Sequence, residues 1–314
     1  MKGKAKAEGK QNRFRVMILI QTELHNGSDI CRKIKTTIKK KLMNMENKNG
    51  DARISWRDGA VLVFKQVLMA VVVMGTAGFI VPPLYKLIMG EVNMVNTTII
   101  SSALYSLVLL VIFTRKKWCV LTGTYFRSRP WAVLLWTAIA AMGWIIVSGA
   151  LEEVMPELPN LVEEELTQLI NNDFGYFTLC LFAPLIEEMI FRGAVLRTLI
   201  RSMQNRWGAI AVSALLFALI HMNPAQMPGA FLAGLFLGWL FSRTGSILPG
   251  VVFHWVNNTV VFLFCRMMPQ YADANFSDFF GGNQKNMFLA VAFSLLIVLP
   301  AVYQLSIRTR DKAA

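Results

Sequence analysis

Two adjacent carboxylates lie inside an otherwise apolar segment of the chain. Glu187 and Glu188 belong to the stretch APLIEEMIFRG, and Arg192 follows four residues after the second glutamate. Carboxylates at the depth of a membrane are costly, so they face a protein interior or water and usually have partners. Because residues four apart share a helix face, Glu188 can pair with Arg192, which leaves Glu187 without a local partner. The simpler alternative is that both carboxylates only hold helices together.

Two of the three histidines also lie in apolar segments. His221 ends the stretch FALIH, and His254 begins HWVNN, in which Asn258 lies four residues later on the same helix face. A single histidine in such a place is more often a hydrogen-bonded core residue than a catalyst. Three apolar segments together, however, bring two glutamates, two imidazoles and an amide to a similar depth. These are the groups of a site that activates water.

The composition defines the class of protein that positions these groups. Of the 314 residues, 55% are hydrophobic and 16% are charged, which is more apolar than a soluble domain. The net charge of +13 would suggest nucleic acid as a partner, but 15 of the 32 Lys and Arg residues precede residue 59. This distribution indicates a cytosolic tail at anionic lipid and not a nucleic-acid-binding domain. We therefore expect a mobile basic tail at 1–58 and an all-α, polytopic membrane domain at 59–314.

Apolar runs of about 20 residues predict eight membrane helices. They lie at 61–84, 97–114, 131–151, 174–196, 207–222, 228–242, 247–265 and 287–306. With the tail in the cytosol, the loops predicted to be cytosolic hold most of the remaining Lys and Arg, whereas the acidic loop 152–165 falls outside. Eight helices in the cell membrane with both termini cytosolic fit this distribution. Seven or nine would break the alternation.

Three motifs in this part of the chain resemble those of the CAAX proteases and bacteriocin-processing enzymes, also called the Abi family, which includes the type II CAAX prenyl endopeptidases. They lie on separate apolar segments within residues 174–265: E-E-x-x-x-R (Glu187, Glu188, Arg192), F-x-x-x-H (Phe217, His221) and H-x-x-x-N (His254, Asn258). Each motif alone is weak. Their order, spacing and membrane setting make the combination specific.

The resemblance implies an intramembrane endopeptidase of the CAAX prenyl protease 2 type. Its substrate would be a membrane-associated protein or peptide, although the family's preference for prenylated substrates does not carry over to this chain. The family's first glutamate, at Glu187 in this chain, would work with His221 to activate water, and His254 and Asn258 would stabilise the oxyanion. The resemblance also implies that Glu188 is one of the catalytic residues.

Two residues would support this site, and its metal dependence stays open. The resemblance implies that Arg192, with Glu188, holds the catalytic helix in register and that Phe217 supports the site. Two histidines and a glutamate can hold zinc with an open position for water. The sequence H-E-x-x-H is absent, however, and the same residues can activate water without a metal. The four cysteines are scattered and imply neither a disulfide framework nor a thiolate zinc site.

Two functions without catalysis compete with the peptidase. The polar residues could hold together a membrane partner such as a bacteriocin-immunity factor or a scaffold. They could also relay protons in a transporter. Transport is disfavoured because the polar residues gather in one half of the chain and no inverted repeat is evident.

Overall fold

The computed structural model describes residues 53–119, 125, 130–269 and 276–309. Within these ranges the chain forms helices and connecting turns and contains no strand. Residues 1–52 of the predicted basic tail lie outside the described part, so the tail stays a prediction. The first described helix begins at Trp56 and belongs to the compact unit Ser55–Ala314.

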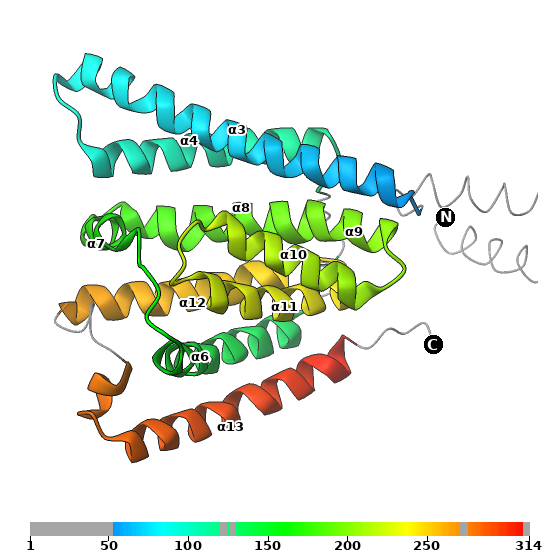
Figure 1. Ribbon diagram of the computed structural model, residues 1–314, viewed down its shortest axis with the longest axis vertical. Helices are drawn as coiled ribbons and strands as arrows, with labels where there is room; N and C mark the ends of the chain where they lie inside the picture. The colour runs from blue at the N-terminus through cyan, green and yellow to red at the C-terminus, as the bar shows by residue number, and fades with distance from the viewer. Residues whose placement is uncertain (1–52, 120–124, 126–129, 270–275, 310–314) are drawn as a thin grey trace, which may run out of the picture. The chain divides into compact units, whose positions relative to one another are not determined.

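Figure 1 shows the arrangement of the described helices. In chain order they are α3 (Trp56–Met89), α4 (Met94–Arg115), α6 (Trp131–Val154), α7 (Glu163–Asn171), η1 (Phe177–Phe182), α8 (Ala183–Glu188), η2 (Met189–Leu196), α9 (Arg197–Ser202), α10 (Arg206–Ile220), α11 (Met227–Thr244), α12 (Leu248–Met267), the short 3₁₀ helix η4 (Phe276–Phe280) and α13 (Gln284–Arg308). The elements from η1 to α9 continue one another without a break, and residues 177–202 are called the composite helix below.

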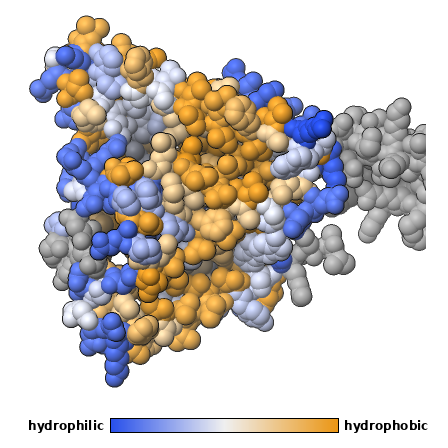
Figure 2. Space-filling model, in the orientation of Figure 1, coloured by the Kyte–Doolittle hydropathy of each residue, from blue (hydrophilic) through white to orange (hydrophobic). Residues whose placement is uncertain are grey.

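Each of the eight predicted apolar segments coincides with a helix. Among the described helices, five are long and apolar enough to cross a membrane, namely α3, α4, α6, α12 and α13. The other three predicted spans correspond to the composite helix, to α10 and to α11, so the count of eight crossings stays a prediction. On the face drawn in Figure 2, hydrophobic residues fill a broad band between two hydrophilic margins. This is the surface that a bilayer requires of a membrane protein.

The composite helix lies between two groups of helices (Figure 1). The hairpin of α3 and α4 packs on one side of it, while α10 and α12 contact it elsewhere. Helix α6 packs against α12 and α13, which lie on the far side from the hairpin. The candidate residues of the composite helix, α10 and α12 therefore face one another in the middle of this arrangement.

Helices α10 and α11 approach closely through two glycines. A Cβ added at Gly234 would lie 2.9 Å from the Cβ of Ala214, and one at Gly238 would lie 2.9 Å from a methyl group of Ile210. Small residues at such crossings allow backbones to pack in direct contact. Gly234 and Gly238 therefore allow α10 and α11 to pack in direct contact.

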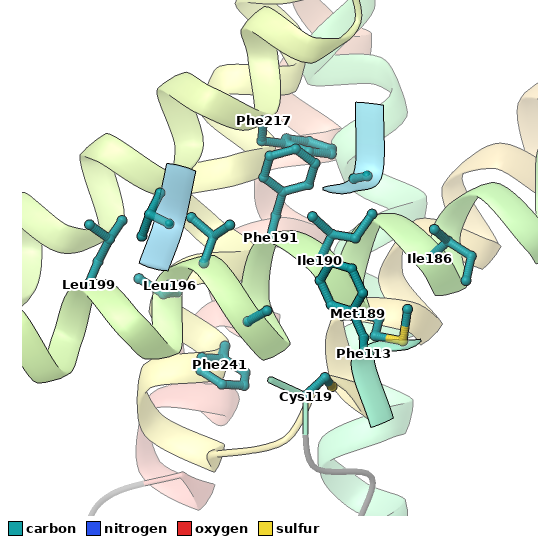
Figure 3. Packing of buried hydrophobic residues seen from close by; sticks show 14 of the residues in the cluster. Phe113, Cys119, Ile186, Met189, Ile190, Phe191, Leu196, Leu199, Phe217 and Phe241 are labelled. Carbon is teal, nitrogen blue, oxygen red and sulfur yellow. The ribbon is translucent and has the colours of Figure 1, made fainter. Parts of the chain in front are cut away.

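A hydrophobic cluster surrounds the second half of the composite helix (Figure 3). Met189, Ile190, Phe191 and Leu196 are all buried there. The ring of Phe191 meets that of Phe217 of α10 edge to face, with centroids 5.2 Å apart. Because such packing is as dense as a crystal, it fixes the rotation of the composite helix and hence the direction of its glutamates.

Candidate active site

The composite helix changes its hydrogen-bond register on both sides of the glutamate pair. Helix α8, which carries Glu187 and Glu188, is flanked by the π-helical segments η1 and η2. A π turn widens the helix and leaves carbonyl groups to other partners, and such turns are frequent at functional sites. One of these carbonyls, that of Phe191, accepts a hydrogen bond of 3.0 Å from the Ser213 hydroxyl of α10.

Glu188 and Arg192 form a buried ion pair. The Arg192 Nη1 atom donates to the Glu188 Oε1 atom at 2.7 Å, and the side chains are 2% and 0% exposed. The guanidinium also lies 4.3 Å from the ring centroid of Phe217, which adds a cation–π contact. The pairing expected from the sequence is therefore present, and Phe217 supports the arginine.

The first turn of α12 lies directly against the Glu188 carboxylate. A Cβ added at Gly250 would overlap the Glu188 Oε2 atom, so only glycine permits this approach. The positive end of the α12 dipole also favours a carboxylate at this place. Sequence reasoning missed Gly250, because a glycine beside Pro249 is typical of an ordinary helix start.

His254 lies between the two carboxylates. Its Nε2 atom is 3.7 Å from the Glu187 Oε2 atom, and its Nδ1 atom is 3.8 Å from the Glu188 Oε1 atom. Both distances are electrostatic contacts and exceed a hydrogen bond. The Phe217 ring meets the imidazole edge to face, with centroids 6.1 Å apart. His254 is thus held by one aromatic contact between two acidic groups.

His221 has an orientation set by its own helix. Its Nδ1 atom lies 2.8 Å from the backbone carbonyl of Phe217, and a carbonyl only accepts. This contact assigns the proton of the neutral ring to Nδ1. The Nε2 atom is then an acceptor that can take a proton or bind a water.

Two cavities meet at Glu187 and His221. The larger, about 310 Å³, is also lined by His254, Asn257 and Asn258. The smaller, about 90 Å³, is also lined by apolar residues of α3 and by Tyr105 of α4. Glu187 is 27% exposed in its side chain, whereas Glu188 is fully buried. Of the two carboxylates, Glu187 is the one that a substrate can reach.

One wall of the larger cavity comes from a helix that the sequence did not assign to the site. Trp144, Ser148 and Glu152 of α6 line it at a spacing of four residues. The signal was available, since residues four apart share a face and two of these three are polar near the end of an apolar span. Asn257 of α12 also lines this cavity and was missed, because Asn258 beside it completed the recognised motif.

The donor groups do not fit a metal centre. Among the described residues, no three His, Cys, Asp or Glu side chains converge as a metal site requires. The Glu188 carboxylate is bonded to Arg192, and His254 faces carboxylates on both ring nitrogens. These side chains are engaged with one another.

The chain was compared with known families, curated proteins and solved structures. Residues 172–260 match the model of the family described as type II CAAX prenyl endopeptidase Rce1-like. Neither the curated proteins nor the solved structures gave a match. The matched range contains the composite helix, α10, α11 and the part of α12 that carries His254 and Asn258. The match over this region supports a CAAX protease family for the chain.

Proposed function

We propose that this membrane protein is an intramembrane endopeptidase that hydrolyses a peptide bond in a membrane-associated protein or peptide. The observation that carries the proposal is the pairing of Glu187 and His221 on the walls of the same two cavities. Glu187 is the reachable carboxylate, and the His221 Nε2 atom is an acceptor. Both groups can therefore bind one water beside a peptide in the larger cavity.

The chemistry follows from these positions. Glu187 takes a proton from the water as its oxygen bonds to the scissile carbonyl carbon, and His221 orients that water through Nε2. The carbonyl oxygen becomes an oxyanion, which donors fixed in advance stabilise. His254 and Asn258 supply these donors. The proton held by Glu187 then passes to the peptide nitrogen as the C–N bond breaks, which leaves a carboxylic acid and an amine.

The surroundings of the site support a substrate that arrives from the membrane. The smaller cavity is lined by Val67, Ala70 and Met74 of α3, and α3 exposes many apolar side chains to its surroundings. A substrate with an apolar anchor can therefore approach within the bilayer. The family match supports peptidase chemistry of the CAAX type. Prenylation of the substrate is not part of the proposal.

A cleavage assay in liposomes tests the proposal. Wild-type protein should cleave a membrane-anchored peptide library, and Glu187→Gln should lower kcat by roughly 10²–10⁴-fold, the range for loss of a general base. Folding should persist, because Glu187 is partly exposed and not part of the buried pair.

The matched control is Glu163→Gln. Glu163 is an exposed glutamate on α7 that lines neither cavity. This variant should cleave like the wild type. Wild-type activity that survives Glu187→Gln would refute the assignment of the base. Each assay is repeated with a chelator, and loss of activity that zinc restores would refute the metal-free version.

A further inference from the structure

A proline leaves one carbonyl of the composite helix without a backbone donor. The Ala183 N–H group donates to the Thr178 carbonyl, five residues earlier, as in a π helix. In that register the next carbonyl, that of Leu179, would accept from residue 184. Residue 184 is a proline and has no N–H group. The Leu179 carbonyl therefore needs a partner from another element.

Asn258 supplies that partner from α12. Its Nδ2 atom donates to the Leu179 carbonyl at 2.9 Å. Because a carbonyl only accepts, this contact fixes which side of the Asn258 amide is nitrogen. The Asn258 Oδ1 atom then points away from Leu179 and accepts a hydrogen bond of 3.1 Å from the Asn257 Nδ2 atom. A relay of two amides thus starts at a carbonyl that Pro184 leaves free.

The end of this relay lies in the larger cavity. Asn257 is three residues after His254 and shares its helix face, and both line the cavity with Glu187. One N–H of the Asn257 amide is used by Asn258. The second is available to a molecule in the cavity. The lining contains the carboxylates of Glu152 and Glu187 and, among the described residues, no Lys or Arg.

We propose that Asn257 binds a backbone carbonyl of the substrate peptide and that Asn258 positions it. A neutral N–H donor suits a peptide carbonyl, which every substrate presents, whereas the acidic lining disfavours an anionic group. Asn257 lines the same cavity as Glu187 and His221, so the bound carbonyl belongs to a peptide unit near the scissile bond. The inference rests on the proposed endopeptidase function.

Substitution of Asn257 tests the contact. Asn257→Ala should raise KM about 5–10-fold with kcat within twofold of the wild type, because one neutral hydrogen bond contributes roughly 1 kcal/mol. Asn257→Asp, which keeps the shape but loses the donor, should raise KM at least as much. The Kd for the same peptide is measured by fluorescence anisotropy in the Glu187→Gln background, where it should rise by the same factor.

Substitution of Pro184 tests the relay. Pro184→Ala restores an N–H group that competes for the Leu179 carbonyl, so Asn258 is released and KM should rise several-fold. In the Asn257→Ala background the same change should leave KM unaltered, since both affect substrate binding through one contact, while kcat falls because Asn258 is also an oxyanion donor. The control Thr259→Val removes a hydroxyl that lies 3.2 Å from the Tyr176 hydroxyl, also between α12 and the start of the composite helix. It should leave KM unchanged.

Several outcomes separate this inference from the proposed function. Absence of peptide cleavage by the wild-type protein would refute the function and leave the Kd comparison intact. Unchanged KM and Kd in Asn257→Ala would overturn the contact with substrate. Additive effects of Pro184→Ala and Asn257→Ala on KM would overturn the relay.

Discussion

Adjacent glutamates in this protein have opposite environments. Glu188 is fully buried between the Arg192 guanidinium and the first turn of α12. Glu187, one residue earlier, points about 100° away around the helix and lines both cavities. The two identical side chains thus differ in role, since Glu188 is a buried structural group and Glu187 is accessible to a substrate. The division depends on rotation alone and requires no difference in residue type.

Removal of Arg192 should destabilise the fold more than it changes the chemistry. Arg192→Ala leaves the Glu188 carboxylate buried without its partner, and loss of one member of a buried pair costs about 3–5 kcal/mol. Thermal unfolding in detergent should show a large drop in Tm. The double variant Glu188→Gln with Arg192→Met removes both charges and should recover much of the loss. A double variant as unstable as Arg192→Ala would contradict this account.

The helices around the site are joined by hydrogen bonds from side chains to backbone carbonyls. Two carbonyls in the π segments, those of Leu179 and Phe191, accept from Asn258 and Ser213 on neighbouring helices. At these π turns, hydrogen bonds within the composite helix are therefore replaced by hydrogen bonds to neighbouring helices. This exchange ties α10 and α12 to the composite helix on both sides of the glutamates.

Gly250 sets how closely α12 approaches α8. Gly250→Ala should displace the Glu188 carboxylate, lower stability by about 1–3 kcal/mol and reduce kcat, because the carboxylate pair shifts relative to His254. The measurements are Tm and the cleavage rate. Gly75→Ala on α3 is the matched control, since a Cβ there has no neighbour within 4 Å. A Tm and a cleavage rate of Gly250→Ala equal to those of the wild type would contradict this role of the Gly250 contact.

The sequence predicts the positions of the helices well, for a physical reason. Membrane helices need long apolar runs, so their positions are readable, and the i,i+4 rule predicts the contact of Glu188 with Arg192. The π turns, and the bond from Asn258 to Leu179, do not follow from periodicity, since they depend on how neighbouring helices meet. Asn257 and the α6 wall were missed for the same reason. They reach the cavity through tertiary packing.

The whole molecule has two ends with different loops. Figure 1 shows α7, in the acidic loop after α6, at one end of the helices, and the turn from α9 to α10 at the other. A membrane across the apolar band of Figure 2 would separate these two loops. The positive-inside rule predicts that the basic end, at Arg201 and Arg206, faces the cytosol.

Cysteine labelling in intact cells tests this orientation. In a background without the native cysteines, Glu157→Cys should react with an impermeant maleimide from outside, while Arg206→Cys should react only after the cells are opened. The reason is that the two positions belong to loops on opposite sides of the bilayer. Labelling of Arg206→Cys in sealed cells would refute the predicted topology.

The helices of this protein differ greatly in length. At 1.5 Å per residue, the 34 residues of α3 rise about 51 Å, whereas the 15 residues of α10 rise about 22 Å. No uniform bilayer matches both lengths. Helix α3 must tilt or the lipid beside it must thicken, whereas α10 is too short to cross unless the lipid beside it thins. We expect cleavage to depend on acyl-chain length, with a maximum in liposomes of intermediate chains. Rates that stay constant from short to long chains would mean that this hydrophobic mismatch is absorbed away from the site.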